Sequence, residues 1–235
     1  MRAKGVLLTA ATVILTMGAS MNANAGLFGF SGDGWKEEAL QPDGSRIVVE
    51  RSLSRKGRHE IGQRSPGGDE SLSFVMPGTG QRLIWEDKHS EDIGSGNFNP
   101  MMLGVSQGRA YVMVTPQGCL SYNKWGRPNP PYVVFRFEGK EWARIALADL
   151  PAEFTLPNLI ISSPDDQVEK SGTRFITAEM VGRMNQGFGR AEYKTILREP
   201  YKGAGGGCEE LIRYKGYWIM PNDPIARDMV DRKTK

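Results

Sequence analysis

The segment "PYVVFRFEGKEWARIAL", residues 131–147, carries the strongest indication of how this chain folds. Its apolar residues recur at every second position, which is the pattern of strands with one face turned to a core. A turn at residues 138–140, Glu-Gly-Lys, divides it in two, so the segment predicts a β-hairpin. The expected faces are Val133, Phe135 and Phe137 on the first strand, and on the second strand Ile145 with Leu147 on one side and Trp142 with Arg144 on the other.

Similar segments extend from this hairpin in both directions. The most regular are residues 45–54, residues 71–76 with the return strand around Leu83 and Trp85, residues 109–115 and residues 157–162. In residues 109–115 both faces carry apolar side chains, so both faces are expected to be covered. We count about eight to ten strands before residue 163. The chain is therefore predicted to be a mainly β protein with antiparallel sheets, arranged as a sandwich, an open barrel or a small propeller-like array.

The last third of the chain differs in pattern and predicts one or two short helices. The first begins after Thr177, a residue type that caps helices, and carries the apolar stripe Met180, Val181 and Met184. The second begins after Asp223, with Pro224 in its first turn. Between them, "GAGGGC" at residues 203–208 predicts a flexible loop, and "GYWIM" at residues 216–220 predicts a final strand.

The first 25 residues have the layout of a secretory signal peptide. Arg2 and Lys4 precede an uncharged apolar run at residues 5–19, and Ala23-Asn24-Ala25 is a small-x-small cleavage signal. Residues 26–235 then form a single mainly β domain with a helical C-terminal portion. No later stretch is long and apolar enough to span a membrane. We expect a periplasmic or secreted protein.

Two cysteines, Cys119 and Cys208, are predicted to form a disulfide, because paired cysteines oxidise in exported proteins. Their spacing, and that of the two histidines, matches no zinc motif, so no metal site and no cofactor are expected. Losing Arg2 and Lys4 lowers the formal net charge from +3 to +1, which excludes a globally basic binder of nucleic acid.

Motifs of catalytic chemistry are weak in this chain. "GVSQG" at residues 104–108 resembles the serine-hydrolase elbow, but a strand follows it where a helix is required, so we interpret it as a turn. Four pairs of neighbouring acids, Glu37-Glu38, Glu86-Asp87, Asp165-Asp166 and Glu209-Glu210, are interpreted as solvated surface residues. Neighbours in a strand point to opposite faces and cannot act together on one glycosidic bond.

The candidate binding surface combines two polar loops. One contains Arg58, His59 and Glu60 within "GRHEIGQ", in a locally basic stretch that would attract a polyanion. The other contains Trp125 and Arg127, within residues 124–131. Trp35 also lies in a loop-like context and is a further candidate for stacking on a ligand, whereas Trp85, Trp142 and Trp218 are expected in the core.

Several segments together, above all "GRHEIGQ" and "KWGRPNPPYV", resemble a group of exported bacterial hypothetical proteins of unknown function. The resemblance covers most of the chain after residue 25. It implies an exported single-domain protein and supplies no activity, ligand or catalytic residue.

These observations favour a non-catalytic binding or interaction protein of the cell envelope, because polar and aromatic residues are concentrated in long loops between strands. Its partner is expected to be an envelope glycan, a lipid headgroup or another protein. The alternative is a hydrolase of an envelope polymer, which requires a facing pair of carboxyl groups.

Overall fold

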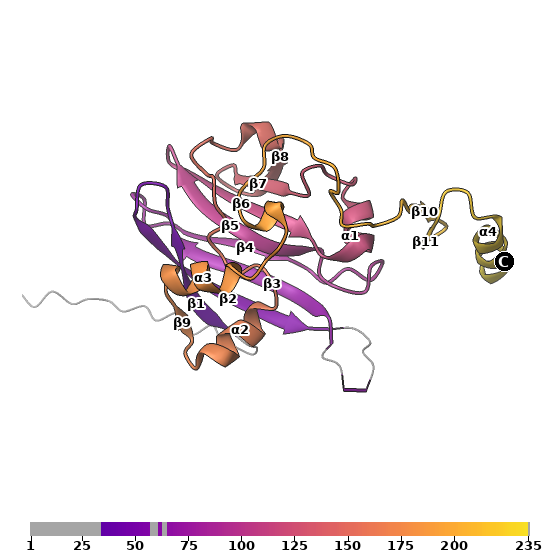
Figure 1. Ribbon diagram of the computed structural model, residues 1–235, viewed down its shortest axis with the longest axis horizontal. Helices are drawn as coiled ribbons and strands as arrows, with labels where there is room; N and C mark the ends of the chain where they lie inside the picture. Colours follow the sequence, from indigo (N-terminus) through magenta and orange to yellow (C-terminus); the bar gives the residue numbers. More distant parts are fainter. Residues whose placement is uncertain (1–33, 57–60, 63–64, 235) are drawn as a thin grey trace, which may run out of the picture.

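Two sheets form the body of the protein in the computed structural model, which describes residues 34–56, 61–62 and 65–234 (Figure 1). The first sheet has the order β4-β3-β2-β1-β9, with antiparallel neighbours except for the parallel pair β1–β9. Its strands are β1 (Trp35–Leu40), β2 (Arg46–Arg55), β3 (Gly67–Val75), β4 (Arg82–Asp87) and β9 (Phe175–Ile176).

The second sheet has the order β5-β6-β7-β8 and is antiparallel throughout. Its strands are β5 (Phe98–Ser106), β6 (Arg109–Pro116), β7 (Val133–Phe137) and β8 (Trp142–Ile145). Strands β7 and β8 form the predicted hairpin, with Val134 opposite Ile145 and Phe137 opposite Trp142. Gly139 supplies the positive φ of +87° that the turn between them requires.

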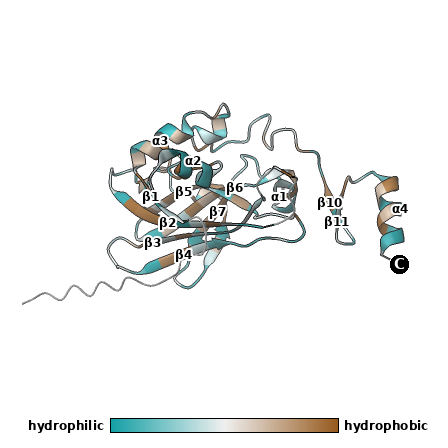
Figure 2. Cartoon of the chain, turned by 90° about the horizontal axis from the view of Figure 1, so that it is seen from below, coloured by the Kyte–Doolittle hydropathy of each residue, from teal (hydrophilic) through white to brown (hydrophobic). Residues whose placement is uncertain are grey.

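The two sheets pack face to face around one apolar core. The first sheet contributes Ile47, Val49, Leu72, Phe74, Leu83 and Trp85, and the second contributes Phe98, Leu103, Val112, Val114 and Val133. Figure 2 shows hydrophobic residues, in brown, on strands of both sheets. The mainly β prediction with antiparallel sheets is confirmed, and of the three architectures left open the observed one is a sandwich.

The other face of the second sheet is also covered, as the alternation in residues 109–115 predicted. Met101, Tyr111, Met113 and Val134 point to this face and pack against Phe154, Ile161 and Ile196 from the long connections that follow β8. The prediction of a strand at residues 157–162 is wrong. This buried segment has no strand partner, and its main chain bonds instead to Met101 and to side chains of neighbouring elements.

Four α-helices and two 3₁₀ turns complete the described part of the chain. They are α1 (Gly118–Lys124), α2 (Pro164–Ser171), α3 (Ala178–Asn185), α4 (Pro224–Lys233), η1 (Leu147–Asp149) and η2 (Ala191–Tyr193). Both predicted helices are present: the Thr177 side chain caps α3 and the Asp223 side chain caps α4. Helices α1 and α2 were not predicted, although Pro164 and two acids in the first turn of α2 are typical start signals.

The C-terminal residues project from the sandwich. Strands β10 (Ile212–Tyr214) and β11 (Tyr217–Ile219) form a hairpin, which together with α4 stands away from the two sheets in both views (Figures 1 and 2). This arm exposes Ile225 and Met229 on one face of α4. In the described residues no helix combines the length and apolar character needed to cross a membrane.

Strand β5 lies at an edge of its sheet, where unpaired main-chain groups need partners. The Asn158 amide supplies them: Leu103 N donates to Asn158 Oδ1 at 2.9 Å, and Asn158 Nδ2 donates to Leu103 O at 2.8 Å and to Leu40 O at 2.9 Å. Gln41 repeats the arrangement, since Val105 N donates to Gln41 Oε1 at 3.0 Å. Two amide side chains therefore close this edge and connect it to β1.

Asn158→Ala is expected to lower the free energy of unfolding by about 2–3 kcal/mol, because buried main-chain groups of Leu103 lose their partners. Urea denaturation of the purified mature protein measures the change. Asn222→Ala, at an exposed position of the same residue type, is the control and should change stability by less than about 0.5 kcal/mol. Equal effects of the two substitutions would contradict the role assigned to Asn158.

Candidate functional site

Of the two loops of the predicted binding surface, the structure describes the one with Trp125 and Arg127. Arg58, His59 and Glu60 lie outside the described residues, so their part of the surface stays a prediction. The stem of their loop is described: Arg55 ends β2, and Lys56 pairs with Asp69 on β3 at 2.6 Å.

Trp125 caps α1 at one side of the sandwich and is half-buried. Its ring packs on Phe98 with centroids 4.5 Å apart, and the Arg144 guanidinium lies 5.6 Å from the ring centroid. Its indole N–H donates to Asn97 Oδ1 at 3.3 Å. Trp125 thus contributes to packing at the end of the core, and only part of its ring remains open to a ligand.

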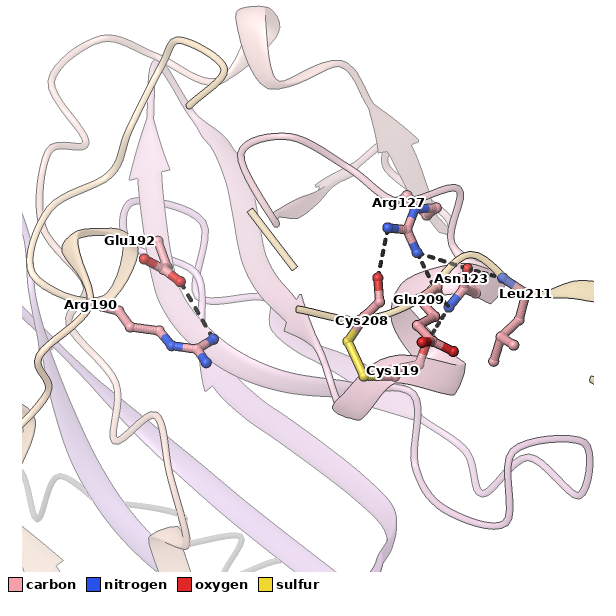
Figure 3. Close-up of a disulfide and its surroundings, with 8 residues drawn as sticks. All are labelled: Cys119, Asn123, Arg127, Arg190, Glu192, Cys208, Glu209 and Leu211. Atoms are coloured by element: carbon pink, nitrogen blue, oxygen red, sulfur yellow. Dashed lines mark hydrogen bonds and ion pairs between the residues drawn. A yellow bond between two sulfur atoms is a disulfide. The ribbon is translucent and has the colours of Figure 1, made fainter. Parts of the chain in front are cut away.

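Arg127 holds the C-terminal segment against α1 (Figure 3). Its guanidinium donates to the carbonyl oxygens of Cys208 at 2.9 Å and Glu209 at 2.8 Å. The Asn123 side chain adds two further bonds, donating to Glu209 O at 2.9 Å and accepting from Leu211 N at 2.8 Å. The donors of Arg127 are therefore largely used within the protein.

The Cys119–Cys208 disulfide, predicted from the sequence, is confirmed. It joins the start of α1 to the end of the glycine-rich loop, with a Cα–Cα distance of 5.2 Å and a sequence separation of 89 residues. Closing so long a span constrains the unfolded chain strongly. The disulfide and Arg127 therefore attach the arm to the sandwich at the same place (Figure 3).

A cleft lies between β1, the end of β2 and α2. It has a volume of about 490 Å³. Its lining includes Trp35, Arg55, Asp165, Glu169, Thr173 and Arg174. Trp35 was interpreted as a loop residue, and that interpretation is wrong: it lies on β1 and is 2% exposed, because it alternates with Glu37 and Ala39 on the inward face.

The two arginines of the cleft have different partners. Arg55 binds Asp165, donating from Nε to Oδ2 at 2.8 Å and also from Nη2. Arg174 is exposed and donates to Gly34 O at 2.7 Å. Among the described residues no carboxylate lies within ion-pairing distance of Arg174. Within the described part of the chain, the cleft therefore offers one arginine that forms no ion pair.

Directly behind Trp35 lies a buried cluster of three charged residues. Arg51 donates to Glu37 Oε1 at 2.9 Å and to Glu70 Oε1 at 2.5 Å, and its guanidinium lies 5.3 Å from the Trp35 ring centroid. Arg51 and Glu37 are 1% and 0% exposed. The strand registers explain the cluster, because Arg51 lies opposite Trp35 and Glu70 opposite Leu53, so all these side chains point inward.

The interpretation of neighbouring acids as solvated surface residues is wrong for three of the four pairs. Glu37, Asp87 and Asp165 are each buried, while their neighbours are more exposed. Side-chain alternation explains the difference in the two strand pairs, because one member of each pair must face the core. Burial raises the pKa of Glu70, against the opposing effect of Arg51, and burial also raises the pKa of Asp87.

A signal for this cluster is present in the sequence. Arg51 occupies an apolar-face position in the alternation Ile47, Val49, Arg51, Leu53, and Glu37 and Glu70 do the same on their own strands. A charged residue at an inward position on three strands indicates mutual pairing, since isolated buried charges are costly. Pairing could not be assigned beforehand, because it depends on which strands are neighbours.

The geometry required for a glycoside hydrolase is two carboxyl groups about 5–10 Å apart across a cleft. Glu37 and Glu70 converge on Arg51, but in the protein interior. In the cleft, Asp165 and Glu169 both come from α2, one helical turn apart. The hydrolase alternative stays a prediction. The described residues contain no group of three or more histidine, cysteine or acidic side chains that could hold a metal ion.

No family model, no curated protein and no solved structure matches this chain. The resemblance to exported bacterial proteins therefore stays a prediction.

The raised pKa of Glu70 predicts a particular pH dependence of stability. The folded protein holds this proton more tightly than the unfolded chain, whose carboxyl has a pKa of about 4.3. The stabilisation from protonation is complete below that pH and is lost as pH rises through the folded-state pKa. Glu70→Gln keeps an acceptor for Arg51 but cannot ionise. Its stability relative to the native chain should therefore increase as pH rises from 4 to 8.

Urea denaturation across this pH range measures the effect. Glu86→Gln, at an exposed position on β4, is the matched control, and the effect of Glu70 is the difference between the two variants. A Glu70→Gln variant that loses stability relative to the native chain with rising pH would show that ionised Glu70 stabilises the fold.

Proposed function

We propose that this chain is an exported protein of the cell envelope, periplasmic or secreted, that binds an anionic ligand without catalysis. The ligand class is an acidic glycan or a phosphorylated glycolipid. The site is the cleft formed by β1, the end of β2 and α2.

The observation that carries this proposal is Arg174 in the lining of this cleft. A guanidinium has five donors in a planar fork that suits carboxylate and phosphate groups. Arg174 gives one of these donors to a main-chain carbonyl and has no carboxylate partner among the described residues. A bound anion would supply the missing charge.

The rest of the cleft suits recognition rather than reaction. Arg55 and Asp165 form an ion pair in one wall of the cleft. Thr173 adds a hydroxyl at the rim, and Trp35 and Val168 supply an apolar base. A few fixed polar groups over an apolar base are typical of a ligand site.

Export is supported by the leader in residues 1–25 and by the state of the cysteines. Both cysteines of the chain are joined in one disulfide, and disulfides persist in oxidising compartments. The leader itself lies outside the described residues.

Full-length protein expressed in a Gram-negative host should appear in the periplasmic or extracellular fraction. Its N-terminus should be Gly26, because the small-x-small signal ends at Ala25. N-terminal sequencing and thiol labelling without reductant check both points, with Cys119 and Cys208 expected to resist labelling. Uncleaved protein with reactive thiols in the cytosol would contradict export.

Arg174→Ala should weaken binding of the anionic ligand by about 10-fold or more, which corresponds to a lost charge-assisted contact. Binding to an acidic polysaccharide and to vesicles containing lipopolysaccharide is measured in parallel arms, at two salt concentrations, because exposed charge contacts weaken with salt. The two arms distinguish a glycan from a lipid-linked phosphate.

Lys140→Ala removes an exposed charge in the β7–β8 turn, outside the cleft, and serves as the matched control. It should bind like the native chain. Native-like binding by Arg174→Ala, or an equal loss in both variants, would remove the cleft as the site.

A further inference from the structure

A second, smaller pocket lies beside the disulfide and shares no residue with the cleft of Arg174. Its volume is about 230 Å³, below the roughly 300–1,000 Å³ of pockets for drug-sized ligands. Four parts of the chain meet there: the end of β6, helix α1, the turn η2 and the glycine-rich loop. Only a small ligand, or one unit of a polymer, would fit.

The polar wall of this pocket is the pair Arg190 and Glu192. Glu192 is buried, at 3% exposure, whereas Arg190 is exposed. The two side chains face one another in Figure 3, with 3.8 Å between Arg190 Nη1 and Glu192 Oε1. That distance is too long for a hydrogen bond. The carboxylate can therefore still accept, and the guanidinium can still donate, at neighbouring points of the same wall.

A hydrogen bond from the Tyr132 hydroxyl to the main chain of Glu192 keeps Glu192 at this wall. The Tyr132 hydroxyl donates to Glu192 O at 2.8 Å and accepts from Leu197 N at 3.3 Å. Tyr201 carries a buried hydroxyl near the same carboxylate, and burial together with Glu192 raises its pKa. Contacts from Tyr132 and Tyr201 thus position Glu192.

Much of the remaining lining is ring surface. Tyr122, Tyr193, Pro116 and Pro131 contribute ring surfaces. The glycine-rich loop closes the pocket at close range. A Cβ added at Gly206 would lie 2.5 Å from the Arg190 guanidinium, and one at Gly205 would lie 2.3 Å from the Tyr122 ring. The sequence predicted a flexible loop, whereas here glycine is required because the main chain touches both side chains.

We propose that this pocket binds one neutral sugar residue, free or as a unit of an envelope glycan. Vicinal hydroxyls of a sugar donate and accept at adjacent positions, which matches the carboxylate and guanidinium of Glu192 and Arg190. The C–H faces of the ring fit the tyrosine and proline walls.

The charge of the pocket wall favours a neutral ligand. Arg190 and Glu192 compensate one another, so the wall has no net charge to offer. A charged ligand would lose its hydration beside a buried carboxylate. The Arg190–Glu192 pair has no net charge, so attraction to it would not offset this desolvation free energy. Neutral hydroxyls form charge-assisted hydrogen bonds with both groups and leave the ion pair in place.

Ligand-observed NMR at millimolar concentrations tests the proposal on the mature protein. The probes are glucose, N-acetylglucosamine, glucuronic acid and the zwitterion glycine. At least one neutral sugar should bind, and Glu192→Gln should weaken it by about 10-fold, as expected for the loss of a charged acceptor. Arg174→Ala should leave this binding unchanged, so that failure here is distinguishable from failure of the anion-binding cleft.

Two glycine substitutions provide a second test that does not depend on Glu192. Gly206→Ala and Gly207→Ala both place a side chain at positive φ, +58° and +86°, so both strain the loop. Only the Gly206 substitution also displaces Arg190, because nothing lies within 4 Å of a Cβ at Gly207. Sugar binding should be lost in Gly206→Ala and kept within about 2-fold in Gly207→Ala.

The expected pattern supports the proposal only as a whole. Binding of glycine or glucuronic acid alone, failure of both neutral sugars to bind, or sugar binding that survives Glu192→Gln or Gly206→Ala would overturn it. Circular dichroism and urea denaturation of each variant separate loss of the pocket from loss of the fold.

Discussion

The contact of Arg51 with Glu37 and Glu70 is the constraint on which the first sheet depends. A buried ion cluster of this kind need not be more stable than an apolar core, but removing one member leaves a charge without a partner. It also constrains strand register, because a one-residue slip of β2 would turn Arg51 outward and separate it from both acids. The same cluster orders residues 157–162, since Arg51 donates to Ile160 O and Ile160 N donates to Glu37. Through Trp35 it supports the base of the cleft.

A second constraint operates where the C-terminal part of the chain leaves the sandwich. The disulfide, Arg127 and Asn123 all act on residues 208–211, which places the glycine-rich loop against Tyr122 and Arg190. The small pocket exists only because these contacts bring η2, α1 and the loop together. Both proposed binding sites thus include residues from connections between strands, where binding residues are commonly found.

Much of the strand structure was predictable, and the candidate sites were not. The alternation around Gly139 and in residues 71–76 reports burial directly, so the hairpins and their faces were recovered. Trp35 was misplaced because its neighbours in sequence are glycine and aspartate, whereas its environment is set by β2 and α2. Arg174 and Glu192 stand in segments without a motif, so nothing local distinguishes them from other surface charges.

The sequence by itself determined the antiparallel β class, two capped helices and the pairing of its only two cysteines. Each of these depends on residues close together in the chain, or on a pair with no alternative partner. The tertiary structure decided that the sheets form a sandwich, that Arg51 lies between two acids, and that Arg190 and Glu192 face a pocket. These features depend on which distant segments become neighbours, and that is set by the packing of the whole core.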